Sequence, residues 1–161
     1  MSKTALEDGT KAEGGAREKR APSLARAAWH GHRGEWFGCF NELKALKRGS
    51  EVGDLPDLFL SYYGQAVARC ERDLQEAERL CREGLQVAFY RPEAHWNLAS
   101  VLICARDYES ARSVIAQGLA MDGDNRLLRR LRDELQAKAG SSGGTRGGEG
   151  LLGRLLDWFS S

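Results

Sequence analysis

The stretch of sequence that decides the fold is PEAHWNLASVLICARDYESARSVIAQGLAMDGDN, residues 92–125. Its apolar residues recur every three or four positions, and it contains no run in which apolar and polar residues alternate. Helical spacing without strand-like alternation predicts helices. Pro92 stands just before the first periodic segment, a position where proline is tolerated. We therefore expect two helices here, with a turn at Asp107 and Tyr108.

The region before this stretch repeats its pattern with a period of 34 residues. A fixed period of about 20–50 residues is typical of stacked structural repeats. Several of the recurring residues are small, which lets neighbouring helices approach closely. The pairs that are identical at this offset are Val67 and Val101, Cys70 and Cys104, Arg72 and Arg106, Asp73 and Asp107, Ala77 and Ala111, Gly84 and Gly118, and Leu85 and Leu119.

Residues 92–125 resemble a tetratricopeptide repeat (TPR), a helix-turn-helix unit that stacks into a right-handed superhelix. Residues 57–91 are similar, and residues 23–48 resemble a third, degenerate unit. The resemblance implies an all-α fold, an α-solenoid of stacked TPR-like hairpins with a C-terminal capping helix over residues 126–138. The residues that carry it are Leu98, Ala99, Asp107, Tyr108, Ala111 and Leu119 in residues 92–125, and Tyr63, Gly64, Ala77, Gly84 and Leu85 in residues 57–91.

Capping residues place the helix boundaries in the first half of this region. Ser23 is expected to cap a helix that runs to His32, and Gly49 is expected to stop the next one. Asp57 is expected to cap a third helix, and a fourth is expected to begin at about Asp73.

The two ends of the chain differ in composition from the helical-repeat domain expected over residues 22–139. Residues 1–21 are polar and mixed in charge, which predicts a disordered tail. Residues 140–150 (GSSGGTRGGEG) predict a flexible linker with a root-mean-square reach of about 17–20 Å. The linker leads to residues 151–161, a short and strongly apolar tail.

Length and charge limit the possible functions. The chain has 161 residues, with 24 basic and 23 acidic side chains and a formal net charge of +1. This balance gives no global attraction to nucleic acids or to anionic membranes. No apolar run approaches the about 18 residues of a membrane span, and the N-terminus has no apolar core typical of a secretory signal. We therefore expect a cytoplasmic protein.

The sequence contains no catalytic or metal-binding motif that we can identify. No two cysteines form a C-x-x-C pair, so all four are expected to be small apolar residues. His30 and His32 lie two positions apart in a predicted helix, where their side chains diverge by about 200°. His95 is expected to be a packing or surface residue. We predict no enzymatic activity, no metal and no cofactor.

The resemblance implies a concave face, made mainly by the first helix of each repeat, that binds a peptide or a partner helix. Asn97 is expected to bind the backbone of the ligand through its amide group, the alternative being a consensus residue that faces solvent. No lysine lies between Lys47 and Lys138, so aromatic and arginine contacts are favoured over a lysine clamp. The expected groove residues are Tyr62, Gln65, Arg69, Glu93, Trp96, Asn97, Ser100 and Cys104.

Four arginines lie close together at Arg126, Arg129, Arg130 and Arg132. They are a candidate contact for phosphates or an acidic partner, but a solvated outer face is the preferred interpretation. Nucleic-acid binding is not expected, because no aromatic residues are interleaved with the arginines.

The tail LLGRLLDWFSS, residues 151–161, predicts an amphipathic helix about 16 Å long, too short to span a bilayer. Its possible docking sites are a partner protein, a second copy of the chain, its own concave face and a membrane surface. The sequence therefore predicts an adaptor or assembly factor, the alternative being a peripheral membrane protein held by this tail. The tail residues expected to dock are Leu151, Leu152, Leu155, Leu156, Trp158 and Phe159.

Overall fold

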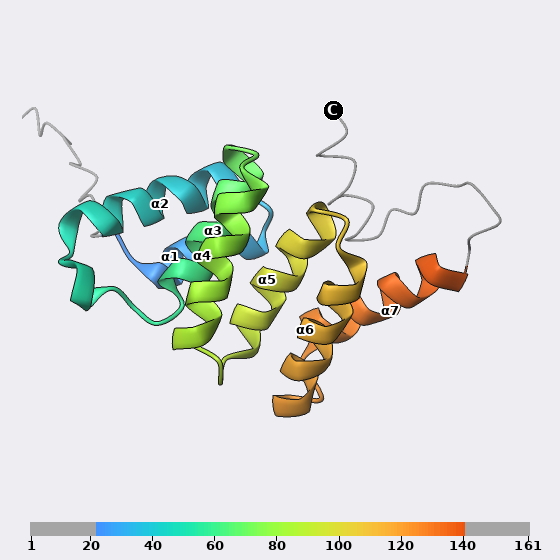
Figure 1. Cartoon of the computed structure of the whole chain (residues 1–161). Helices are drawn as coiled ribbons and strands as arrows, with labels where there is room; N and C mark the ends of the chain where they lie inside the picture. The colour runs from blue at the N-terminus through green and yellow to red at the C-terminus, as the bar shows by residue number, and fades with distance from the viewer. Residues whose placement is uncertain (1–21, 141–161) are drawn as a thin grey trace, which may run out of the picture.

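The computed structural model describes residues 22–140, and every regular element in this part of the chain is helical (Figure 1). The expectation of an all-helical fold is confirmed for these residues. The seven α-helices are α1 (Leu24–His32), α2 (Trp36–Gly49), α3 (Phe59–Cys70), α4 (Leu74–Val87), α5 (Pro92–Cys104), α6 (Tyr108–Met121) and α7 (Arg126–Gly140), with a short 3₁₀ helix at Val52–Asp54 between α2 and α3.

The helices pack in the order of the chain. Each α-helix contacts the next one, and α1, α3, α5 and α7 also contact one another in that order. Figure 1 shows the helices following one another across the molecule, from α1 and α2 at one end to α7 at the other. The odd-numbered helices therefore form a continuous row.

Side-chain caps begin three of the helices: α1 at the expected cap Ser23, α4 at Asp73, where that helix was expected to begin, and α6 at Asp107 in the expected turn. The side-chain oxygens of Ser23, Asp73 and Asp107 accept hydrogen bonds from backbone N–H groups three residues further on, at 3.0–3.3 Å. Asp57 was expected to cap α3, and this is wrong, because the helix begins at Phe59 after Leu58.

Asp57 instead accepts a hydrogen bond from the hydroxyl of Tyr90. It therefore links the segment before α3 to the α4–α5 loop, and this long-range contact takes the place of the local cap.

The turns inside the three helix pairs share one backbone conformation. Gly34, Arg72 and Arg106 have φ angles of 78°, 59° and 64°, in the left-handed region that side chains other than glycine disfavour. After Gly34, the N–H of Glu35 donates to the carbonyl of His30 at 2.9 Å. After Arg106, Asp107 donates to Leu102 at the same distance. The α1–α2 turn thus has the geometry of the α5–α6 turn.

Small residues lie where helices touch, as the repeat pattern predicted. Ala77 and Ala111 have no exposed surface. A Cβ atom on Gly84 would lie 2.6 Å from the backbone nitrogen of Ser61, and one on Gly118 would lie 2.8 Å from the Cβ of His95. Ser61 and His95 are themselves 34 residues apart, so the close approach recurs with the repeat.

Some of the sequence predictions concern residues outside 22–140, and others can be compared with the described helices and cysteines. The disordered tail over residues 1–21, the docking tail over residues 151–161 and all of the linker except Gly140 lie outside the described residues. Among the helices that are described, none has the length and apolar character needed to cross a membrane. Cys39, Cys81 and Cys104 are buried and Cys70 is half-buried, all as free thiols.

The side-chain cap at Asp73 is expected to stabilise α4. Asp73→Ala is expected to lower the free energy of unfolding by about 0.5–2 kcal/mol, because the first turn of α4 loses its acceptor. Asp73→Asn is the matched control and is expected to change little, since asparagine caps equally well. Urea unfolding followed by circular dichroism measures both, and equal losses would show that charge, not capping, matters.

Candidate functional site

All eight expected groove residues lie on two neighbouring helices, α3 and α5, and seven of them are buried. We call these seven the α3–α5 face. Glu93 lies in the first turn of α5. Burial raises the pKa of the Tyr62 hydroxyl, and the negative charge of Glu93 raises it further. The face consists of Tyr62, Gln65 and Arg69, which share one side of α3, and of Trp96, Asn97, Ser100 and Cys104 on α5.

This face is covered rather than open to solvent. The resemblance implied an accessible groove, but the exposed fractions of Tyr62, Gln65, Arg69, Trp96, Asn97, Ser100 and Cys104 are 2, 1, 8, 5, 0, 1 and 7 %. The expectation of a solvent-exposed groove at these residues is therefore corrected.

Two side chains of the α1–α2 pair lie on the face. The Nε2 atom of His32 is 2.9 Å from the hydroxyl of Tyr62, and the His32 ring stacks on Trp96 with centroids 5.6 Å apart. The guanidinium carbon of Arg69 lies 5.4 Å from the ring centroid of Trp36. The end of α1 and the start of α2 thus contribute to the cover, because α1 packs beside α3.

Asn97 connects the two helices of the face. Its Nδ2 atom donates a hydrogen bond of 2.8 Å to Oγ of Ser61 on α3, and Ser61 donates in turn to the carbonyl of Leu58. Asn97 therefore does not face solvent, which corrects one of its two sequence interpretations. The other interpretation, binding of a ligand backbone, stays a prediction.

Replacement of Asn97 is consequently expected to affect stability. Asn97→Ala is expected to lower the free energy of unfolding by about 1–3 kcal/mol, because it removes a buried hydrogen bond and leaves Ser61 without its donor. Thermal unfolding measures the change. Asn41→Ala removes an exposed asparagine of α2 outside the face and serves as a comparison; an Asn97→Ala protein as stable as wild type would argue against the buried bond.

The face also holds buried polar atoms that have no hydrogen-bond partner. They are both side-chain polar atoms of Gln65, Nε of Arg69, Nε1 of Trp96 and Oδ1 of Asn97. Such atoms are rare in folded proteins, because each loses its bonds to water without replacement. The sequence does not predict these unpartnered atoms, because their hydrogen bonding depends on how α3 packs against α5.

Burial also sets the chemistry of the face. It raises the pKa of the Cys104 thiol to about 11 and lowers the pKa of the Arg69 guanidinium. Away from the face, burial raises the pKa of Cys39 to about 12. These two thiols are therefore protonated at neutral pH, and a protonated thiol is not a nucleophile.

His30 and His95, unlike His32, contact groups that lie within five residues of them in the sequence. Nδ1 of His30 lies 2.7 Å from Glu35, and Nδ1 of His95 lies 3.2 Å from the carbonyl of Arg91. Over residues 22–140, no group of three or more histidine, cysteine or carboxylate side chains is arranged to hold a metal ion.

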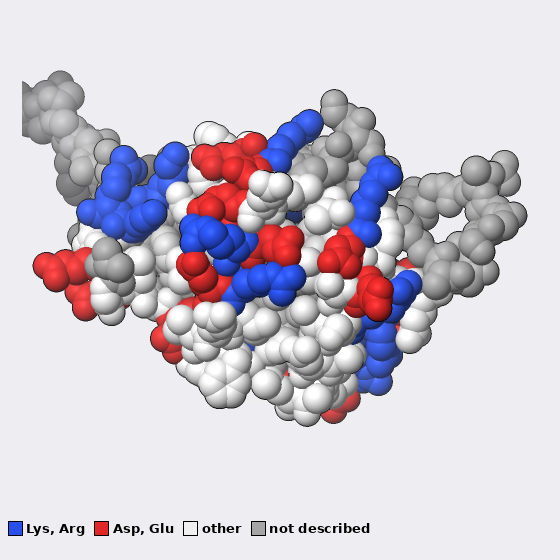
Figure 2. All heavy atoms as spheres, in the orientation of Figure 1, with Lys and Arg blue, Asp and Glu red and all other residues white. Residues whose placement is uncertain are grey.

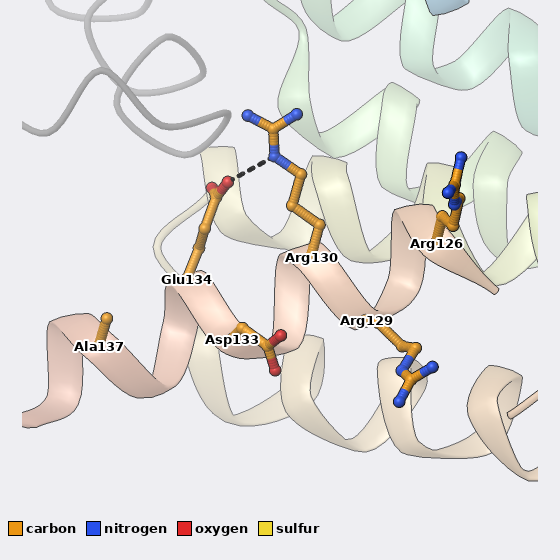
Figure 3. A pocket seen from close by; sticks show the side chains of 6 residues that line it. All are labelled: Arg126, Arg129, Arg130, Asp133, Glu134 and Ala137. Atoms are coloured by element: carbon orange, nitrogen blue, oxygen red, sulfur yellow. Dashed lines mark hydrogen bonds and ion pairs between the residues drawn. The ribbon is translucent and has the colours of Figure 1, made fainter. Parts of the chain in front are cut away.

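The arginine-rich segment borders a shallow hollow of about 490 Å³ along α7 (Figure 3). Arg130 is paired with Glu134 at 2.9 Å, Arg129 with Asp124 at 3.1 Å and Arg132 with Asp133 at 2.8 Å. Arginines paired with neighbouring carboxylates on an exposed helix fit the expected solvated outer face.

A second hollow, of about 480 Å³, lies between α4 and α6, outside the expected groove. Leu98 and Val114 are buried at its wall, whereas Phe89 is 60 % exposed. Above it, Figure 2 shows acidic and basic side chains intermixed over α4, where Arg79 and Arg82 pair with glutamates. The repeat pattern did not predict this hollow, because it depends on the gap between two helices of different pairs.

Comparison with known proteins gives no family for this chain. No protein-family model matches it, and no curated protein matches its sequence.

Proposed function

We propose that the protein is a non-enzymatic adaptor or assembly factor that binds a segment of a partner protein on the α3–α5 face. In this proposal the three helix pairs form a short TPR-like α-solenoid, α7 caps it, and the row of odd-numbered helices is its concave side. The tail at residues 151–161 is a second docking element.

The observation that carries the proposal is the α3–α5 face itself. Tyr62 and Trp96 occupy equivalent positions of two units, 34 residues apart, and lie under the same side chain, His32. Several buried polar atoms of the face have no hydrogen-bond partner among residues 22–140. A surface that combines aromatic area with unused hydrogen-bonding groups is suited to binding an extended or helical segment.

Binding at a covered face requires the cover to move. In this proposal α1 moves and takes His32 off Tyr62 and Trp96, and the Trp36 side chain at the start of α2 turns away from Arg69. Helix α1 has nine residues, and isolated helices shorter than about 12–15 residues are marginal in water. Only Ala27 and Gly31 of α1 are fully buried. Displacing α1 therefore costs less than displacing α3 or α5, which are buried along most of their length.

Site-specific cross-linking tests the proposal. A photo-reactive phenylalanine derivative replaces Glu93, which is half-buried beside the face, and the full chain is used to capture a partner. Ser113, exposed at the hollow between α4 and α6, is the matched control position. Cross-links from position 93 and none from position 113 are expected; the reverse pattern would place the site on the opposite side of the molecule.

A further inference from the structure

Arg69 is a buried cation without a counter-ion. Its side chain is 8 % exposed, and it takes part in none of the ion pairs of residues 22–140. Burial lowers the pKa of its guanidinium, and the thiols of Cys104 and Cys70 oppose this shift. The guanidinium lies over the ring of Trp36. Carboxylates are not among these neighbours.

A buried charge of this kind is costly, because it has lost its hydration without gaining an opposite charge. A cation–π contact compensates only a small part of this loss. The side-chain amide of Gln65 is also incompletely satisfied, since neither its nitrogen nor its oxygen has a hydrogen-bond partner among residues 22–140. Gln65 lies one helical turn from Arg69 on the same side of α3.

We propose that Arg69 and Gln65 recognise the carboxylate of an aspartate or glutamate side chain in the partner segment. This inference rests on the proposed function and names the chemistry of its partner. Arg69 and Gln65 both supply N–H donors, and the two oxygens of a carboxylate accept about four hydrogen bonds. One guanidinium matches the single negative charge of a carboxylate, whereas a phosphate carries about two, and α3 and α5 contain no lysine.

The proposal predicts opposite effects of one substitution on stability and on binding. Arg69→Met keeps most of the side-chain volume and removes the unpaired charge, so the melting temperature is expected to stay equal or to rise by up to about 8 °C. Gln65→Leu is expected to act in the same direction. Arg79→Met, at an exposed arginine of α4, is the control for general effects of losing a charge. A structural role for Arg69 would instead lower the melting temperature, and that result would overturn the proposal.

Selection from a random 12-residue phage-displayed peptide library tests the binding side with the full chain. Peptides selected by wild type are expected to be enriched in aspartate or glutamate, and their affinity for the Arg69→Met protein is expected to fall about tenfold or more. Replacing the enriched acidic residue by its amide should cause the same loss for wild type and none for Arg69→Met.

The outcomes separate the inference from the function on which it rests. Peptides that bind wild type and Arg69→Met equally well, and cross-link from position 93, would overturn acid recognition and leave the proposed function in place. Failure of wild type to select any peptide would overturn both.

Discussion

Replacing Ala111 by leucine is expected to lower the free energy of unfolding by about 1–3 kcal/mol. Ala111 has no exposed surface and lies in the first turn of α6, four residues after Asp107, whose side chain caps this helix. Three additional carbon atoms have no space there, so α6 must shift away from its neighbours or the side chain must leave its preferred rotamer. Ala77→Leu at the equivalent position of α4 is expected to have an effect of the same size.

Ala120→Leu is the matched control, because Ala120 lies on the exposed side of the same helix. It is expected to change the unfolding free energy by about 0.5 kcal/mol or less. Urea unfolding at constant temperature compares the variants directly. An Ala111→Leu protein as stable as Ala120→Leu would contradict the close packing that we assign to the repeated small residues.

Gly84→Ala is expected to destabilise the protein by about 1–3 kcal/mol, although alanine is the better helix former. The added methyl group would lie 2.6 Å from the backbone nitrogen of Ser61 and 3.0 Å from its Cα. Backbone atoms cannot turn aside as the end of a flexible side chain does, so α3 and α4 must separate. Thermal unfolding is expected to show a clear drop in the melting temperature.

Gly49→Ala provides the control with the opposite sign. Gly49 is the last residue of α2, and a Cβ atom there would meet nothing within 4 Å. This variant is expected to be neutral or to gain up to about 1 kcal/mol from its helix propensity. If both glycine variants changed stability in the same direction, the steric explanation for Gly84 would fail.

Local rules predicted much of the helical framework. Ser23 could be identified as a cap, and the start of α4 could be placed at about Asp73, because both depend on residues within one turn. The close contacts at Gly84 and Gly118 followed from the 34-residue period. Asp57 shows the limit of such rules, since its partner Tyr90 lies 33 residues away and nothing near Asp57 indicates it.

The candidate site was predictable in its residues but not in its surroundings. The resemblance to the repeat family implied that Tyr62 and Trp96 share one face, and His32 contacts both of them. The stacking of His32 on Trp96 depends on how α1 docks on α3, which no local pattern specifies. The burial of Asn97 was missed for the same reason, because its partner Ser61 belongs to another helix.

Hydrogen–deuterium exchange of the full chain, with and without the cross-linked partner, tests most directly whether the α3–α5 face binds that partner. We predict slower exchange in α3 and α5 on binding, where the partner contacts the protein, together with faster exchange in α1, which is displaced. Slower exchange confined to α4 and α6, with α1, α3 and α5 unchanged, would contradict this and assign binding to the hollow beside Phe89.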